Sequence, residues 1–206
     1  MKLKSSFTIV IITLLFSSSF KLFAQDNFIT TVIGDQVWMA KNLDVVTFNN
    51  GDLIPEAKTE KEWKKAADAG TPAWCYYDGY ESNGNKYGKM YNWYAITDSR
   101  GLAPKGWKIP QKADWEKLIN KYQNNTALLY SVLIQGGLTG LNVLLGGRRL
   151  PKGEFQYFEI YATLWCASLT DNGKYSYYLE IDKQYTKSSL REGAMGSGNY
   201  VRCIKE

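Results

Sequence analysis

Apolar residues recur with helical spacing in a first segment, residues 59–69. Trp63 lies on its apolar face, and Thr59 and Glu62 have the three-residue spacing of a capping box. Gly70 follows the segment, as glycine commonly does after the last turn of a helix. The pattern therefore predicts a helix over residues 59–69.

A second helical pattern follows a loop that ends at Pro110. Pro110 fixes the backbone just before the helix begins, and Asp114 lies in the first turn, where a carboxylate can accept a bond from a free backbone N–H. Gln111 stands at the cap, where Ser or Thr is preferred. One apolar stripe consists of Trp115, Leu118, Ile119 and Tyr122. These residues predict a helix that ends near Tyr122.

Apolar runs and apolar–polar alternation predict short strands elsewhere in the chain. The two-residue turn signals Gly34–Asp35 and Asn172–Gly173 indicate hairpins. The predicted segments are residues 30–40, 162–168, 174–182 and 199–204. Together with the two helices, these strands predict an α+β fold with antiparallel sheets and long loops.

The end of the chain is predicted as a loop followed by a strand. Residues 188–198 are rich in Ser and Gly and are therefore interpreted as a loop. In the strand over residues 199–204, Val201 and Cys203 share one face and Arg202 lies on the other, because side chains alternate along a strand.

Residues 78–85 form a polar segment, rich in Asp, Asn and Gly, between two aromatic runs. Side-chain oxygens of this kind suit Ca²⁺. The spacing is not that of an EF-hand, and such clusters usually form plain turns. We therefore predict a loop without a cofactor or metal, with calcium as the alternative.

Residues 1–24 have the pattern of a secretory signal peptide. Basic residues precede an apolar run over residues 7–16, which is too short for a bilayer span of ~20 residues. Ala24 suits a cleavage site. We expect residues 25–206 to form a single exported domain, in the periplasm or at the extracellular surface, with no membrane span after cleavage.

The charge balance and the absence of histidine narrow the classes of function. The chain carries 25 Lys and Arg against 20 Asp and Glu, without the basic stripe that marks nucleic-acid binders. No nucleic-acid partner is therefore expected. With no histidine, the sequence excludes Ser-His-Asp and Cys-His nucleophile systems and His-ligated zinc or haem.

The three cysteines are Cys75, Cys166 and Cys203. In an exported protein two of them can pair and leave the third free. Their spacing does not choose the pair, and it matches no zinc motif.

Several stretches of the chain resemble one family of exported bacterial proteins, the Fibrobacter succinogenes major paralogous domain. The matching stretches are residues 37–43, 48–55, 62–63, 72–77, 87–95, 100–107 and 201–203. That family is similar in turn to the formylglycine-generating (sulfatase-modifying) proteins, whose Gly-Trp-Arg-Leu-Pro signature looks like residues 106–116. The resemblance implies a C-type-lectin-like α+β fold, with two helices, small twisted antiparallel sheets and long loops. It implies no established activity.

The resemblance also implies an assignment for the cysteines. Cys75 and Cys203 lie in stretches that match the family, which implies a Cys75–Cys203 disulfide. Cys166 lies in a departure from the family, residues 164–168, which implies a free thiol. The closely spaced thiol pair of the formylglycine-generating enzymes has no counterpart here.

Two functional classes follow, and a structural role as a surface-layer or assembly subunit is neither supported nor excluded by the sequence. The first is a non-catalytic binding or adhesion domain for a glycan or a surface protein, since aromatic rings stack on sugar faces and anchor interfaces. The second is a thiol-dependent oxidase-like enzyme, which needs a reactive thiolate. We favour the first class and predict no enzymatic activity. The candidate ligand-binding residues are Tyr80, Tyr157, Tyr178, Arg148 and Arg149.

Overall fold

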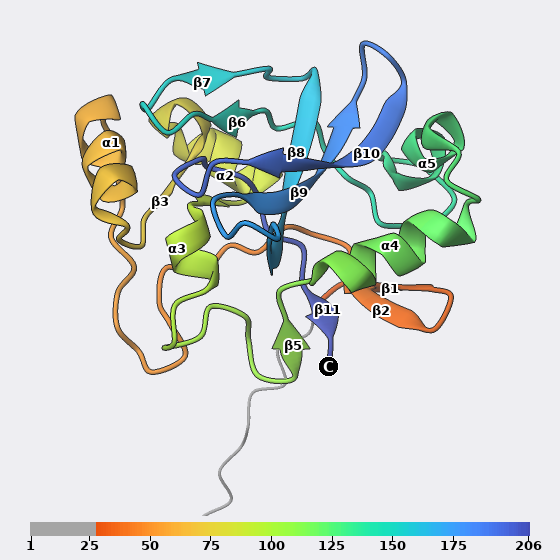
Figure 1. The fold of residues 1–206 in the computed structure, drawn as a ribbon, viewed down its shortest axis with the longest axis horizontal. Helices are drawn as coiled ribbons and strands as arrows, with labels where there is room; N and C mark the ends of the chain where they lie inside the picture. Colours follow the sequence, from red (N-terminus) through yellow and green to blue (C-terminus); the bar gives the residue numbers. More distant parts are fainter. Residues whose placement is uncertain (1–27) are drawn as a thin grey trace, which may run out of the picture.

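The computed structural model describes residues 28–206 and shows a mixed α+β fold (Figure 1). The predicted signal peptide, residues 1–24, lies outside the described residues. The helices are α1 (Glu60–Ala69), α2 (Glu81–Tyr87), α3 (Trp93–Ile96), α4 (Lys112–Lys121) and α5 (Thr126–Leu133), with a 3₁₀ helix η1 at Tyr77–Gly79. Within residues 28–206, none of the helices combines the length and the apolar character needed to cross a membrane.

The strands are short and form several small sheets. They are β1 (Thr30–Ile33), β2 (Gln36–Met39), β3 (Trp74–Cys75), β4 (Met90–Tyr91), β5 (Trp107–Lys108), β6 (Arg148–Arg149), β7 (Phe155–Gln156), β8 (Tyr161–Leu169), β9 (Ser176–Asp182), β10 (Lys187–Gly193) and β11 (Ile204–Lys205). One sheet has the order β1-β2-β11-β5 and a second the order β10-β9-β8, while β3-β4 and β6-β7 are two-stranded. All named pairings are antiparallel, as predicted.

Both predicted hairpins are confirmed. β1 and β2 pair around a turn in which Gly34 has a φ of 68°, and β8 and β9 pair around a turn in which Gly173 has a φ of 67°. Glycine tolerates this left-handed backbone because it has no Cβ. The turn residues therefore fix which strand segments face each other.

The helix predicted over residues 59–69 is confirmed as α1, with both halves of its capping box. The Thr59 hydroxyl accepts a bond from the Glu62 N–H at 3.2 Å, and Glu62 Oε2 accepts one from the Thr59 N–H at 2.9 Å. Gly70 ends the helix in the left-handed conformation, with a φ of 65°. These caps satisfy backbone groups that have no partner inside the helix.

Helix α4 is also confirmed, and a distant strand strengthens its weak cap. Asp114 Oδ2 accepts a bond from the Gln111 N–H at 2.8 Å. The Ser168 hydroxyl, from β8, accepts a bond from the Lys112 N–H at 2.9 Å and donates one to Gln111 Oε1 at 2.7 Å. The hydroxyl that a Ser or Thr cap would supply thus comes from another element.

The prediction of only two helices is wrong, because α2, α3 and α5 are also present. Helix α2 replaces most of the polar loop predicted over residues 78–85. Its sequence is rich in Asn and Gly, which are poor helix formers, so tertiary packing of its buried Gly84 and Tyr87 decides its structure.

The prediction of a loop over residues 188–198 is also wrong, because β10 occupies most of that segment. Its Ser188 and Leu190 lie opposite Ile181 and Leu179 of β9. The neighbouring strand supplies the hydrogen bonds, so the Ser-rich composition does not prevent a strand here. The final strand is shorter than predicted and consists only of β11.

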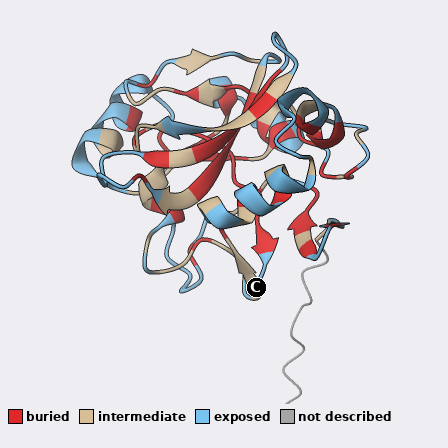
Figure 2. Ribbon diagram, turned by 45° about the vertical axis from the view of Figure 1, so that its right-hand side comes forward, coloured by how far each residue is buried: buried red, intermediate tan, exposed pale blue. Residues whose placement is uncertain are grey.

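Buried side chains form two clusters on opposite faces of short strands. Trp38 belongs to one cluster and its neighbour Met39 to the other, as Cys75 and Trp74 do in β3. This follows from the two-residue period of a strand. Figure 2 shows that burial is concentrated in the central strands, whereas the outer sides of the helices are exposed.

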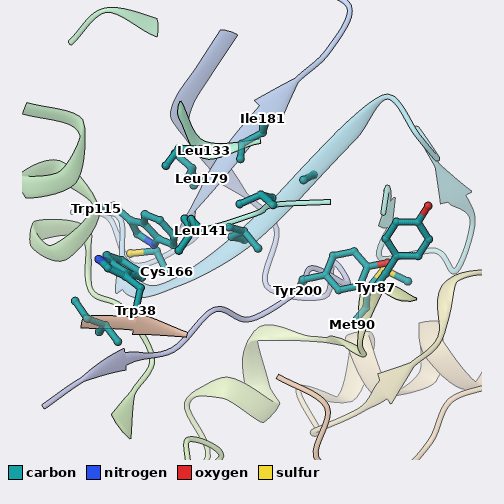
Figure 3. Packing of buried hydrophobic residues seen from close by; sticks show 14 of the residues in the cluster. Trp38, Tyr87, Met90, Trp115, Leu133, Leu141, Cys166, Leu179, Ile181 and Tyr200 are labelled. Carbon is teal, nitrogen blue, oxygen red and sulfur yellow. The ribbon is translucent and has the colours of Figure 1, made fainter. Parts of the chain in front are cut away.

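The first cluster is built around a pair of tryptophans. The rings of Trp38 and Trp115 have centroids 4.5 Å apart, so the hairpin β1–β2 packs against α4. In Figure 3 this pair is seen together with Cys166 at one end of the cluster, while Tyr87 and Tyr200 lie at the other end. The cluster therefore joins the hairpin, α4, the central sheet and α2.

We predict that Ser168→Ala lowers the free energy of unfolding by about 1 kcal/mol, the usual cost of losing a helix cap. The substitution leaves the Lys112 N–H and Gln111 Oε1 without their shared partner. Urea denaturation followed by tryptophan fluorescence measures the change. The matched control is Ser99→Ala, since Ser99 is exposed and its side chain makes no hydrogen bond within residues 28–206. Equal stability of the two variants would contradict the role of Ser168.

Candidate ligand-binding site

Three of the predicted binding residues meet beside the β8–β9–β10 sheet. Arg148 is on β6, Tyr157 follows β7, and Tyr178 is on β9. The guanidinium carbon of Arg148 lies 5.1 Å from the centroid of the Tyr157 ring, and Arg148 Nη1 donates to the Tyr178 hydroxyl at 3.3 Å. A cation–π contact and a hydrogen bond therefore link Arg148 to both tyrosines.

Two further tyrosines, which the sequence reasoning did not single out, extend this group. Tyr161 of β8 stacks on Tyr157 with centroids 4.4 Å apart and planes at 19°. Tyr185 lies in the turn between β9 and β10, where its N–H donates to Asp182 Oδ1 at 3.1 Å; Asp182 is the cross-strand partner of Tyr161. We call Arg148, Tyr157, Tyr161, Tyr178 and Tyr185 the tyrosine–arginine surface.

Exposure varies along the tyrosine–arginine surface. Tyr185 is 63% exposed and Tyr157 is 38% exposed, but Tyr178 is only 7% exposed. The prediction that Tyr178 is a surface residue is therefore wrong, because its ring packs edge-on against Trp165 at a centroid distance of 6.4 Å. Burial raises the pKa of Tyr178, so its hydroxyl stays protonated at neutral pH and can act as a donor or an acceptor.

The backbone of Tyr157 is unusual. Tyr157 has a φ of 62° and Glu159 has a φ of 56°, both in the left-handed region that side-chain-bearing residues seldom adopt. Such conformations cost free energy and persist where surrounding structure holds them. The segment after β7 thus holds the Tyr157 ring in contact with Arg148 and Tyr161 at a local cost in stability.

Chemically, the tyrosine–arginine surface offers aromatic faces, phenol hydroxyls and a guanidinium. Charges of both signs surround it: Glu180 Oε1 accepts a bond from Arg191 Nε at 3.3 Å, and Lys187 Nζ lies 4.7 Å from the centroid of the Tyr185 ring. Desolvation, with smaller contributions from Asp182 and Glu180, raises the pKa of Tyr161. Neutral phenols next to mixed charges are suited to stacking and hydrogen bonding.

The other two predicted binding residues do not join this surface. Tyr80 is 64% exposed at the start of α2, and none of its hydrogen bonds or ring contacts involves the surface. Arg149 is fully buried, where Nε donates to Gly153 O at 2.8 Å and Nη1 to Ala57 O at 2.7 Å. The interpretation of Arg149 as a ligand-binding residue is therefore wrong. Its guanidinium is part of the core, 4.4 Å from the Phe155 ring centroid.

Sequence reasoning also missed the burial of Arg202. Arg202 is 1% exposed, and both Nε and Nη2 donate to Asn42 Oδ1, at 3.0 and 2.8 Å. Nη1 donates to Met39 O at 3.2 Å and also to Leu141 O. Alternation placed Arg202 opposite Val201 and Cys203, but both faces of this segment are buried.

Arg202 lines a cavity of about 630 Å³ between segments that are far apart in the sequence. The lining comes from the residue before β1, from the loop after β2, from α2 and its C-cap, from the region after α5 and from Arg202: Ile29, Ala40, Lys41, Asn42, Asp44, Gly84, Asn85, Lys86, Tyr87, Gly88, Gln135, Gly136, Asn142, Leu144 and Arg202. A neighbouring hollow of about 380 Å³ shares Lys86, Tyr87, Gln135 and Leu144 with it. The cavity is therefore part of a longer depression.

Weak signals for some of the missed residues are present in the sequence. Tyr185 stands in an otherwise polar turn, where a large aromatic side chain is unusual. Arg202 stands between the apolar residues Val201 and Cys203. In the sequence that follows it, the first acidic residue that could pair with it is Glu206, the last residue of the chain. Tyr161 begins a strand and has no such signal.

All three cysteines are unpaired and buried, so the predicted Cys75–Cys203 disulfide is wrong. The physical reason is strand alternation. Cys75 and Trp74 point to opposite sides of β3, and Cys203 belongs to the cluster that contains Trp74. The predicted free thiol, Cys166, lies in the same cluster as Cys75.

The polar segment over residues 78–85 does not form the predicted loop, since it runs through η1 into α2. Within this segment Asn83 Nδ2 donates to Tyr77 O at 3.0 Å, which ties the amide to the backbone. Across residues 28–206, no group of three or more His, Cys, Asp or Glu side chains is placed to hold a metal ion.

A protein-family model described as the Fibrobacter succinogenes major domain matches residues 32–205 of the chain. No curated protein and no solved structure matches it. The family match runs from β1 into β11, so the tyrosine–arginine surface and every residue that lines the cavity beside Arg202, except Ile29, lie inside it.

We predict that none of the three thiols of the folded protein reacts quickly with a disulfide reagent at about pH 8. Burial raises the pKa of Cys75 and Cys203 to about 12 and also raises the pKa of Cys166, so little reactive thiolate forms. In denaturant all three thiols should react. Spectrophotometric thiol counting before and after unfolding measures both states. A fast thiol in the folded protein, or only one thiol after unfolding, would contradict the structure.

Proposed function

The chain belongs to the Fibrobacter succinogenes major domain family, as its motifs predicted, and from this premise we propose that it is an exported, non-catalytic binding or adhesion domain. We propose the periplasm or the cell surface as its location, on the support of the signal-peptide pattern in residues 1–24. We also propose a C-type-lectin-like fold. Its support is the combination of α1 and α4, the small antiparallel sheets and the signature in residues 106–116.

The observation that carries this proposal is the tyrosine–arginine surface. Residues from β6, β8, β9 and two connecting segments gather there, although they are spread over residues 148–185. Aromatic rings with a polar tip bind through stacking and hydrogen bonds at a low cost in side-chain entropy. Several tyrosine rings that gather around one guanidinium therefore favour a binding surface.

The environment of the thiols supports binding over thiol-dependent catalysis. A thiol-dependent oxidase needs an accessible thiolate. Cys75, Cys166 and Cys203 are each no more than 1% exposed, and burial raises the pKa of every one of them. The described residues thus give the alternative enzymatic function no support.

We propose a glycan as the ligand. The stacked pair of Tyr157 and Tyr161 and the exposed ring of Tyr185 provide flat apolar faces, which match the faces of sugar rings. Arg148 and the Tyr178 hydroxyl provide hydrogen-bonding groups, which match sugar hydroxyls. A surface protein is the alternative ligand for this binding domain.

We predict that the purified chain binds glycans on an array and that Tyr157→Ala or Tyr185→Ala weakens this binding about tenfold, which corresponds to ~1.4 kcal/mol. The physical reason is the loss of one stacking face from the tyrosine–arginine surface. Calorimetric titration with the best glycan from the array measures the dissociation constants.

The matched control is Tyr175→Ala. Tyr175 is 45% exposed but lies in the β8–β9 turn, at the opposite end of β9 from the turn that holds Tyr185. The Tyr175→Ala variant should bind glycans as the unsubstituted chain does. If no glycan on the array binds, or if the control loses as much affinity as Tyr157→Ala, the proposed function is wrong.

A further inference from the structure

The cavity beside Arg202 has an excess of positive charge. Its lining contains Lys41, Lys86 and Arg202 but only one acidic residue, Asp44. Asp44 is already engaged, because its carboxylate accepts a bond from Lys89, which does not line the cavity. The electrostatic potential inside the cavity therefore favours an anion.

The charge of Arg202 has no counter-ion within residues 28–206. Its four hydrogen bonds go to the Asn42 amide oxygen and to the backbone carbonyls of Met39 and Leu141, which are all neutral. Burial lowers the pKa of Arg202 to about 9, which still leaves the guanidinium charged at neutral pH. A buried charge that meets only neutral acceptors is unusual, because buried charges are normally paired.

The two lysines stand where a ligand could reach them. Lys41 is exposed, follows β2 and forms no ion pair within residues 28–206. Lys86 is exposed on α2, and its Nζ lies 3.9 Å from Glu159 Oε1, a weak and solvated contact. Arg202 thus provides positive potential from beneath the cavity, while the lysines can contact an anion directly.

Neutral polar groups line much of the remainder of the cavity, together with the apolar side chains of Ile29, Ala40 and Leu144. The side-chain amides of Asn85 and Gln135 are exposed and make no hydrogen bond within residues 28–206. Each amide offers both donors and an acceptor, which is the combination that vicinal hydroxyls need. The volume of about 630 Å³ is in the range of small-ligand pockets.

We propose that this cavity binds a carboxylate-bearing sugar, a uronate, with its carboxylate held by Lys41 and Lys86 above Arg202 and its hydroxyls held by the free amides. The inference concerns a second site. It stands whether or not the tyrosine–arginine surface binds glycans, because none of the residues that define that surface lines this cavity.

The test uses the full chain at low salt and sodium galacturonate or glucuronate as the probe, with galactose, glucose and sodium acetate for comparison. Isothermal titration measures affinity, and the ¹⁵N signal of Arg202 Nε reports on the site. We expect the uronates to bind and to shift the Arg202 signal. We expect the neutral sugars to show no binding and acetate to bind at least about tenfold more weakly.

The informative variant is the double substitution Lys41→Glu with Lys86→Glu, which should weaken uronate binding about tenfold or more. Its matched control is Lys61→Glu with Lys65→Glu, which changes the net charge equally on the exposed side of α1 and should leave affinity within about twofold. Both pairs are exposed, so folding is expected to survive. Tyr157→Ala should leave uronate binding unchanged, which separates this site from the proposed glycan surface.

Several results would overturn the inference. They are an absence of uronate binding, equal binding of galactose and galacturonate, equal binding of acetate and galacturonate, and an equal loss of affinity in the two double variants. Equal binding of acetate would mean a general anion site without sugar recognition. Equal losses would mean that only the net charge of the protein matters.

Discussion

The structure depends on one irregular segment, residues 199–205, here called the seam, which pairs with β8, with the loop after β2 and, through β11, with β2 and β5. Tyr200 exchanges hydrogen bonds with β8, since its N–H donates to Thr163 O and its carbonyl accepts from the Trp165 N–H. The Val201 carbonyl accepts from the Leu43 N–H, and β11 then enters the sheet between β2 and β5. The segment satisfies backbone groups of several short elements that could not satisfy one another.

This seam also explains why an arginine is buried in it. Side chains on both sides of residues 199–204 are buried, so alternation leaves no position there that faces water. Val201 and Cys203 enter one hydrophobic cluster and Tyr200 and Ile204 the other, while Arg202 lies among carbonyl oxygens. The guanidinium ties the loop after β2 to the region after α5 through Asn42 and Leu141.

Local patterns predicted the parts of the fold that local chemistry decides. The capping box of Thr59 and Glu62, the helix after Pro110 and the glycine turns of both hairpins could be predicted because each depends on a few neighbouring residues. Helix α2 and strand β10 could not, because their own residues favour loops and distant partners decide their structure. The false disulfide arose similarly, since family motifs do not show which side of a strand a thiol faces.

In the candidate sites, too, single residues could be named from the sequence, whereas their association depends on distant parts of the chain. Arg148 and Tyr157 could be named from the sequence as single residues, but their association with Tyr161 and Tyr185 depends on the pairing of β8 with β9. Tyr178 is a candidate from the sequence as an aromatic residue, yet its face of β9 is covered, as its contact with Trp165 shows. The burial of Arg149 has a related reason, since the Trp63 ring and the Ala57 carbonyl that it contacts are distant from it in the sequence.

The seam at residues 199–205 has a consequence for how the molecule moves. Because it belongs to both hydrophobic clusters at once, neither cluster can open while the other stays intact, and the core should open as one cooperative unit. Tyr157 and Tyr185 lie outside the seam, in connections at the ends of strands. Amide hydrogens near these two tyrosines can therefore exchange through small local openings, while those of the seam exchange only when the whole domain unfolds.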